Sequence, residues 1–180
     1  MSPPVSLVRG RPAEEVVALL LEGHGRIRAF TELAAGLAEA SAPSRVEVTE
    51  TAARVGHWFG EALALHVRDE EESVLPRLAG RDRQVDAALV AMHRQHADLG
   101  SAVARVVALC AALVEAPSRH AELAAALGAA AAALRERFER HLASEEAYVL
   151  PAIGRHLDDA RCAAILREIR ARRERGHSSR

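Results

Sequence analysis

The chain has 180 residues and a formal net charge of −1, with one Trp, one Tyr and three Phe as its only aromatic residues. A chain of this length can bury the core of one domain without disulfides. The near-neutral charge excludes a general electrostatic attraction to nucleic acid or to an anionic membrane. No window alternates polar and apolar residues over the length of a strand, so the sequence predicts an all-α fold.

The two cysteines, Cys110 and Cys162, lie far apart and outside any C-x-x-C motif. They therefore support neither a disulfide framework nor a zinc knuckle. The N-terminus lacks an apolar segment long enough for a signal peptide, and no run approaches the length of a membrane span. We expect a soluble, cytoplasmic protein whose residues 1–10 form a disordered N-terminus.

The first two expected helices each place a histidine in the apolar stripe that should face the core. A helix beginning near Arg11-Pro12 has apolar residues spaced by three and four, and His24 lies among them. The stretch Ser41-Ala42-Pro43-Ser44 ends it. A second helix over residues 45–79 carries His66 and Glu70 in its stripe.

The second half of the chain repeats this arrangement. After Ala79-Gly80-Arg81, the most regular apolar stripe of the chain contains His96. A break at Ala116-Pro117-Ser118 precedes a fourth helix with His141 and Glu145 in its stripe. Residues 157–180 are expected to form a short fifth helix, with Asp158 or Asp159 as the N-cap, and an Arg-rich tail.

An internal repeat connects the two halves. The sequence H-V-R-D-E-E-E-S-V-L-P of residues 66–76 returns as H-L-A-S-E-E-A-Y-V-L-P at residues 141–151. In each copy a histidine is followed four residues later by a glutamate, which places both side chains on one face of a helix. A shift of 72 residues also superposes His24 on His96. The chain therefore reads as two helical hairpins related by a pseudo-twofold axis.

The positions of the turns provide an independent test, because residues at one level of two antiparallel helices have numbers centred on the turn. His24 and His66 are centred on residue 45, beside the first break. His96 and His141 are centred on 118.5, and Glu70 and His96 on 83, each at or beside a break. The turns, placed from Pro, Gly and Ser alone, bring all four histidines to one level of one bundle.

Four histidines and two glutamates inside a bundle predict a metal site. An unpaired buried carboxylate is costly and normally becomes protonated, whereas a cation removes that cost. Two carboxylates can bridge two metal ions while each ion takes two imidazoles. This ligand set suits non-haem iron, and it also accepts zinc, manganese or copper.

The order and spacing of these residues resemble the hemerythrin and HHE cation-binding domain family, in particular its bacterial single-domain branch, over about residues 12–155. The resemblance implies an antiparallel up-down four-helix bundle over residues 11–156 and a carboxylate-bridged, oxo- or hydroxo-bridged di-iron centre, with zinc or manganese as possible substitutes. Its partner would be a small diatomic ligand, dioxygen or nitric oxide, or peroxide. The implied metal ligands are His24, His66, Glu70, His96, His141 and Glu145.

The sequence departs from the oxygen-carrying invertebrate hemerythrins at one position. The resemblance credits those proteins with a fifth histidine four residues before the one matching His96, but here that position is Met92. His93 is three residues before His96 and lies off the stripe. The missing ligand weakens the case for reversible oxygen carriage and leaves room for redox or peroxide chemistry.

Residues near the expected site have simpler interpretations. We expect His93 at the rim, and we expect Tyr148 in core packing, although it could also join the site. Trp58 and Phe59 are expected to pack in the core, with Cys110 as a small apolar filler.

Glu71, Glu72 and Glu146 should face solvent or pair with arginine, and a glutamate that directly follows a ligand could also support it. Pro76 and Pro151 should end or kink their helices. We expect the Arg-rich tail to fray into solvent.

Three functions fit the sequence. The first is a non-enzymatic di-iron protein for sensing, storage or redox and stress response. The second is a di-iron enzyme that decomposes peroxide or donates iron for repair. The third is a metal-free structural bundle, in which His66→Leu or His141→Leu would only stabilise the fold. We favour the first, with no nucleic-acid or membrane partner and with a monomer or weak homodimer as the state in solution.

Overall fold

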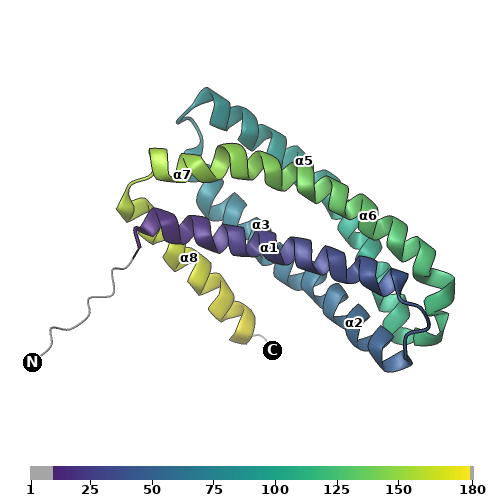
Figure 1. The fold of residues 1–180 in the computed structure, drawn as a ribbon. Coiled ribbons are helices and arrows are strands. Elements are labelled where there is room, and N and C mark those ends of the chain that lie inside the picture. Colours follow the sequence, from purple (N-terminus) through teal and green to yellow (C-terminus); the bar gives the residue numbers. More distant parts are fainter. Residues whose placement is uncertain (1–9, 179–180) are drawn as a thin grey trace, which may run out of the picture.

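The computed structural model describes residues 10–178, which form an antiparallel bundle of four helical rods and a fifth helix (Figure 1). The expected disordered N-terminus falls almost wholly on residues 1–9, outside the described part of the chain. Residues 10–178 contain no strand, so the all-α four-helix bundle with a fifth helix predicted from the sequence is confirmed.

Two of the rods are interrupted by π-helical turns. The first rod is α1 (Pro12–Glu39), and the third is α5 (Arg83–Glu115). The second consists of α2 (Arg45–His57), η1 (Trp58–Ala62), α3 (Leu63–Arg68), η2 (Asp69–Val74) and α4 (Leu75–Leu78). After the 3-10 turn η3 (Pro117–Arg119), the fourth consists of α6 (His120–Ser144), η4 (Glu145–Val149) and α7 (Leu150–His156). The fifth helix is α8 (Asp159–Ser178).

The rods begin and end at the residues that the sequence indicated. Pro12 occupies the first turn of α1, where its missing N–H costs nothing. Ser44 caps α2 by accepting the Glu47 N–H at 3.2 Å, while the Glu47 carboxylate accepts the Ser44 N–H at 2.8 Å. Gly80 turns the chain before α5 with φ of 75°, a conformation that costs a glycine little.

The prolines of the repeat coincide with the π-turns. Pro76 and Pro151 lie in the first turn of α4 and α7, directly after η2 and η4. The wider turns are closed by Leu75 N–H donating to the Glu70 carbonyl and by Leu150 N–H donating to the Glu145 carbonyl. The helices therefore continue beyond the prolines through a local widening, which is a common feature of functional sites.

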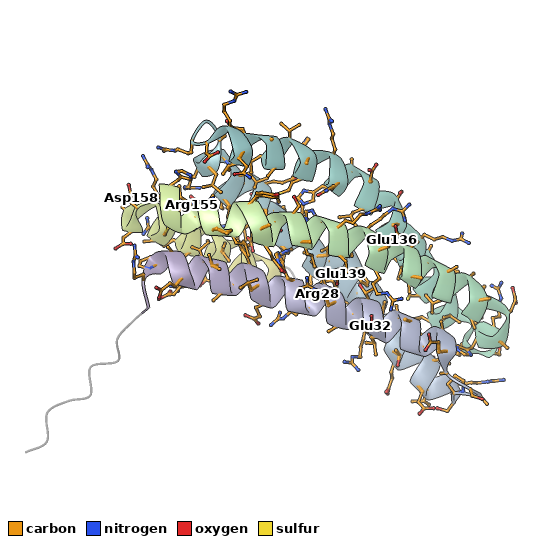
Figure 2. The ribbon with its side chains drawn as sticks, turned by 45° about the horizontal axis from the view of Figure 1, so that its top comes forward. Arg28, Glu32, Glu136, Glu139, Arg155 and Asp158 are labelled. Atoms are coloured by element: carbon orange, nitrogen blue, oxygen red, sulfur yellow. The ribbon has the colours of Figure 1, made fainter. Side chains whose placement is uncertain are left out.

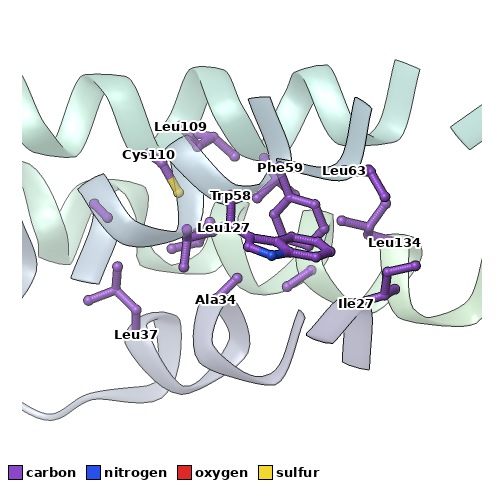
Figure 3. Close-up of a cluster of buried hydrophobic side chains, with 14 of the residues drawn as sticks. Ile27, Ala34, Leu37, Trp58, Phe59, Leu63, Leu109, Cys110, Leu127 and Leu134 are labelled. Atoms are coloured by element: carbon purple, nitrogen blue, oxygen red, sulfur yellow. The ribbon is translucent and has the colours of Figure 1, made fainter. Parts of the chain in front are cut away.

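Two apolar clusters fill the bundle, one on each side of a polar layer. The first lies toward the α1–α2 turn and includes Trp58, Phe59 and Leu127 (Figure 3). The second, toward the other end, includes Leu20, Met92 and residues of α8. The histidine and glutamate layer therefore lies between two packed apolar regions.

Helix α8 folds back along the N-terminal half of α1 (Figure 1). Asp158 caps it, since its carboxylate accepts the Arg161 N–H at 2.8 Å. The expectation that the Arg-rich tail frays into solvent is wrong for its first turns. Ile169 is fully buried and Arg172 is 5% exposed, because Ile169 packs in the second apolar cluster and Arg172 meets carboxylates of η2.

Helix α5 also departs from expectation. We expected no run approaching a membrane span, but the 33 residues of α5 are long and apolar enough to cross a membrane by length and composition. In this structure α5 is a bundle helix that packs against α2 and α6. Core helices of soluble bundles have the same composition, so this is weak support for a membrane role.

Candidate metal centre

Six side chains from all four rods meet in the polar layer. Each of them is at most 10% exposed. The residues and their elements are His24 on α1, His66 on α3, Glu70 on η2, His96 on α5, His141 on α6 and Glu145 on η4. The structure therefore brings together the six residues that the sequence singled out; their role as metal ligands stays a prediction.

Each glutamate lies between histidines of two different rods. Glu70 places its Oε1 2.8 Å from His66 Nε2 and its Oε2 3.3 Å from His96 Nε2. Glu145 places its Oε2 3.1 Å from His24 Nε2 and 3.9 Å from His141 Nε2. The imidazoles themselves form two edge-on pairs, His24 with His66 at 5.5 Å and His96 with His141 at 4.8 Å between ring centres.

These contacts have ion-pair separations but lack the alignment of good hydrogen bonds. Among the described residues, seven buried polar atoms of this layer have no aligned hydrogen-bond partner. They are Nε2 of His24, His66 and His96 and both carboxylate oxygens of Glu70 and Glu145. Buried polar atoms without partners cost about 1–3 kcal/mol each, and native proteins contain few of them. A cation among these donors would satisfy the atoms together, so the residues present fit a metal site.

Other polar side chains hold the outward nitrogen of three of the four imidazoles. Glu146 Oε1 lies 2.9 Å from His24 Nδ1, and Glu71 Oε1 lies 2.8 Å from His96 Nδ1. The residue after each buried glutamate thus supports a histidine of the opposite half, as the sequence allowed. The third contact joins Gln95 Oε1 to His141 Nδ1 at 3.1 Å. Such contacts fix the tautomer and the orientation of a metal-binding imidazole.

His66 has a different neighbour on this side. A Cβ atom added to Gly23 would lie 2.5 Å from His66 Nδ1 and 2.6 Å from Cε1, far closer than such atoms can approach. Gly23 therefore leaves the space that the His66 ring occupies. Both residues also line a cavity of about 570 Å³ between α1 and the second rod.

The pKa values of the two buried glutamates move in opposite directions. Burial raises the pKa of Glu145, and the negative charge of Glu70 raises it further. Burial opposes the charge of Glu70 as well, but the adjacent His66 and His96 lower its pKa well below the usual range. In the absence of a cation the two carboxylates therefore differ in their affinity for a proton.

The histidines are also shifted apart. Burial disfavours the charge of His96, yet Glu70 and Glu71 offset it and raise the pKa of His96 to about 9. Burial lowers the pKa of His141 to about 4, with the nearby histidines acting in the same direction and Glu70 in the opposite one. Such divergence among neighbouring groups is typical of functional sites.

Two groups of donors have the closeness needed to hold a metal ion. One consists of His24, His66 and Glu70, and the other of Glu70, His96 and His141, with donor atoms within 4.8 Å of one another in each. Glu70 belongs to both and therefore lies where a bridging ligand would lie. Among residues 10–178, Glu145 joins neither group, although its Oε2 approaches His24 and His141.

The neighbouring residues agree with the sequence except for one. The His93 side chain is 80% exposed at the rim, and Trp58, Phe59 and Cys110 are buried in the core. Tyr148 is 40% exposed, so the prediction of core packing is wrong. The π-turn Glu145–Val149 turns less per residue than an α-helix, which rotates Tyr148 away from the face expected for it.

Comparison with known families decides the classification. Residues 15–153 match the Hemerythrin HHE cation binding domain, well over half of the chain. The chain belongs to this hemerythrin family. Among curated proteins none is significantly similar to it. The family's cation-binding description agrees with a buried layer of imidazoles and carboxylates whose donor atoms lack other partners.

Sequence reasoning missed two residues of this hemerythrin-family site. Gln95 lies one residue before His96 and off the apolar stripe, so no periodicity marked it. Gly23 lies directly before His24, and the shift of 72 residues that superposes the two halves places it on Gln95. That superposition was the available signal.

Proposed function

We propose that this protein is a non-haem di-iron protein that interacts with dioxygen, nitric oxide or peroxide in sensing, storage or a redox and stress response, and that it is not primarily an enzyme. The observation that carries the proposal is the set of seven buried, unpartnered donor atoms in one layer. A cation among these donors would offset the cost of burying them, which supports the proposal.

The donor set supports two irons. His24 and His66 would hold one, His96 and His141 the other, with Glu70 shared and Glu145 on the opposite side. Mixed imidazole and carboxylate donors without thiolate suit non-haem iron, although they also accept zinc or manganese. Two irons would supply a redox-active pair able to bind a small oxidant or a diatomic ligand.

A second cavity supports an uncharged ligand. It has a volume of about 350 Å³ and reaches His66, Glu70, His96 and His141. Most of its remaining lining is apolar, including Ile27, Phe59, Leu63, Leu99, Val103 and Phe138. An apolar lining admits dioxygen or nitric oxide without a desolvation cost and disfavours ions.

Peroxide decomposition is the second candidate. The larger cavity beside Gly23 and His66 is lined by charged groups, among them Glu22, Arg26 and Glu61. A polar molecule such as peroxide is more compatible with this cavity than with the apolar one. Sustained release of dioxygen from added peroxide by the iron-loaded protein would favour the enzyme, and slow single-turnover oxidation would favour a sensor.

The test is the iron content of the protein purified from iron-supplemented cells, measured by elemental analysis together with an absorption spectrum. We expect close to two irons per chain and near-ultraviolet bands that fade in His66→Ala. His93→Ala is the matched control, because the His93 side chain is 80% exposed at the rim of the same layer and lies 3.8 Å from Glu71, too far for a hydrogen bond. No stoichiometric metal in the wild type, and unchanged stability in His66→Ala, would contradict the proposal and favour the metal-free bundle.

A further inference from the structure

The C-terminal helix contacts the turn that carries the shared glutamate. Arg172 of α8 donates through Nη1 to Asp69 Oδ1 at 2.5 Å and through Nε to Glu72 Oε2 at 3.1 Å, and its Nη2 donates to Ser73 Oγ. All three acceptors belong to η2, the π-turn that contains Glu70. The guanidinium therefore grips the outer side of this turn, while Glu70 points from it into the metal layer.

The other copy of the repeat lacks this contact. The positions of Asp69, Glu72 and Ser73 correspond to Ser144, Ala147 and Tyr148 in the second copy, which offers no carboxylate at any of the three. The C-terminal helix also lies outside the region that matches the family. The grip is thus a feature of one half of this chain, and it acts on the glutamate that belongs to both donor groups.

Burial makes the contact informative. Arg172 is 5% exposed and Asp69 is 2% exposed. Taking two charges out of water costs several kcal/mol per ion, so a buried pair is weak support for stability and is better explained by the need for one particular geometry. Here the geometry concerned is that of a π-turn, which is less regular than an α-helix and gains most from an external support.

A second arginine of α8, Arg173, pairs with the same Asp69 and closes part of a cavity that reaches the layer. Arg173 Nη2 lies 3.6 Å from Asp69 Oδ2, and both residues line the cavity of about 570 Å³ that also exposes Gly23 and His66. Release of α8 would therefore remove the support of the turn that carries Glu70 and, at the same time, widen this cavity.

We propose that α8 is a latch, in which Arg172 positions the π-turn of Glu70 so that cation binding in the layer and docking of α8 strengthen each other. The inference rests on the proposed function, since it requires a cation at Glu70. Coupling of this kind is reciprocal: if docked α8 raises the affinity for the cation, the bound cation holds α8 in place to the same extent. Arg172 is a positioning residue that touches no bound ligand.

The test compares Arg172→Gln with Arg170→Gln. Arg170 lies on the same helix and pairs at 3.6 Å with Glu15 of α1, so its loss weakens α8 without touching η2. Affinity for Fe²⁺ is measured anaerobically by competition with a chromogenic chelator. Hydrogen exchange of the backbone amides of residues 160–175 is measured with and without Fe²⁺.

We expect Arg172→Gln to lower the affinity for Fe²⁺ by roughly tenfold, the usual size of effects from groups that orient metal ligands. Fe²⁺ should slow exchange in α8 of the wild type and of Arg170→Gln, and should slow it much less in Arg172→Gln. Arg172→Lys should recover part of both effects, because a lysine keeps the charge but not the forked geometry.

Other outcomes are equally clear. If the wild type binds Fe²⁺ and the two arginine variants are equal in affinity and in exchange, the latch is wrong and the proposed function stands. If the wild type binds no Fe²⁺, both are wrong. If Arg172→Gln does not fold, Glu72→Gln removes one of the three contacts of Arg172 at a half-exposed carboxylate. The proposal then requires that Fe²⁺ slows hydrogen exchange in α8 less in Glu72→Gln than in the wild type.

Discussion

The two halves of the bundle agree in the donor atoms and differ in what surrounds them. His24 and His96 each lie against a buried glutamate and have their outward nitrogen held by the next glutamate of the opposite half. Around the other two histidines the halves diverge. His141 is supported by Gln95, whereas His66 lies against Gly23 beside a cavity.

The two buried carboxylates, Glu70 and Glu145, also differ in their surroundings. Glu70 belongs to both donor groups and lies on a turn that Arg172 of α8 contacts through buried Asp69, whereas the turn of Glu145 is contacted by Arg28 of α1 through the partly exposed Glu146. The pseudo-twofold symmetry thus governs the inner donor atoms, where ligand geometry leaves little freedom. The residues around the donor atoms do not follow this symmetry. The two proposed iron positions should therefore differ in their affinity for iron and in how easily a ligand reaches them.

The largest expected effect distinguishes the two glutamates. Glu70→Gln should remove nearly all bound iron, because both donor groups contain Glu70. Glu145→Gln should keep a substantial part of the iron, since each donor group retains its two imidazoles and Glu70. The measurement is iron per chain after desalting. Equal losses in the two variants would show that the glutamates act symmetrically and that the assignment of Glu70 as the shared ligand is wrong.

The second prediction concerns the space that Gly23 leaves for His66. Gly23→Ala forces the ring out of place, so iron should fall toward one per chain and the free energy of unfolding by about 1–3 kcal/mol. Gly25→Ala is the matched control, because nothing lies within 4 Å of a Cβ there. It should keep its iron and gain up to about 1 kcal/mol from better helix propensity. Urea unfolding and elemental analysis measure both, and equal iron content in the two variants would contradict the role of Gly23.

The fold and the inner layer were accessible from the sequence because each left a periodic signal. Apolar residues every three or four positions marked the rods, and Ser44, Gly80 and Pro117 marked the turns. The six inner residues stood in the stripes where apolar residues were expected. Their convergence then followed from the turn positions alone.

The features that the sequence did not reveal depend on contacts that leave no regular spacing in the sequence. Successive residues of a π-turn are rotated by a smaller angle than those of an α-helix. The face of Tyr148 was predicted with the α-helical angle, and it was therefore placed wrongly. Arg172 looked like part of a solvated tail because its partners Asp69 and Glu72 lie about a hundred residues earlier. Gln95 and Gly23 lie beside ligands but off the stripes, and only the superposition of the halves connects them.

The third prediction tests the support that only the second half has. Gln95→Leu leaves His141 Nδ1 without its partner, so the affinity for Fe²⁺ should fall by about tenfold at one of the two positions. A biphasic competition curve with an anaerobic chelator would show this loss beside an unchanged second phase. His93→Ala, two residues away and exposed, should leave both phases unchanged. A uniform shift of both phases would mean that the two positions are not independent.

The smallest expected effect concerns the charges that flank Glu146. Arg28 lies 3.1 Å from Glu146 and 3.0 Å from Glu139 across the α1–α6 seam, where the labelled Arg28 and Glu139 lie close together (Figure 2). Half-exposed ion pairs contribute only about 0–1 kcal/mol, and the counterpart Glu71, which has His93 at 3.8 Å, still contacts His96 at 2.8 Å.

Arg28→Gln should therefore lower the affinity for Fe²⁺ by no more than a few-fold, with most of the change abolished in high salt, where exposed charges are screened. Arg135→Gln, which breaks the neighbouring pair with Glu32 on the same seam, should have no effect on Fe²⁺. A loss as large as that in Gln95→Leu would instead show that His24 depends on Arg28 for its orientation. In that case Glu146 and Glu71, which contact His24 and His96, would differ in their effect on the site. The two halves would then differ around all four histidines.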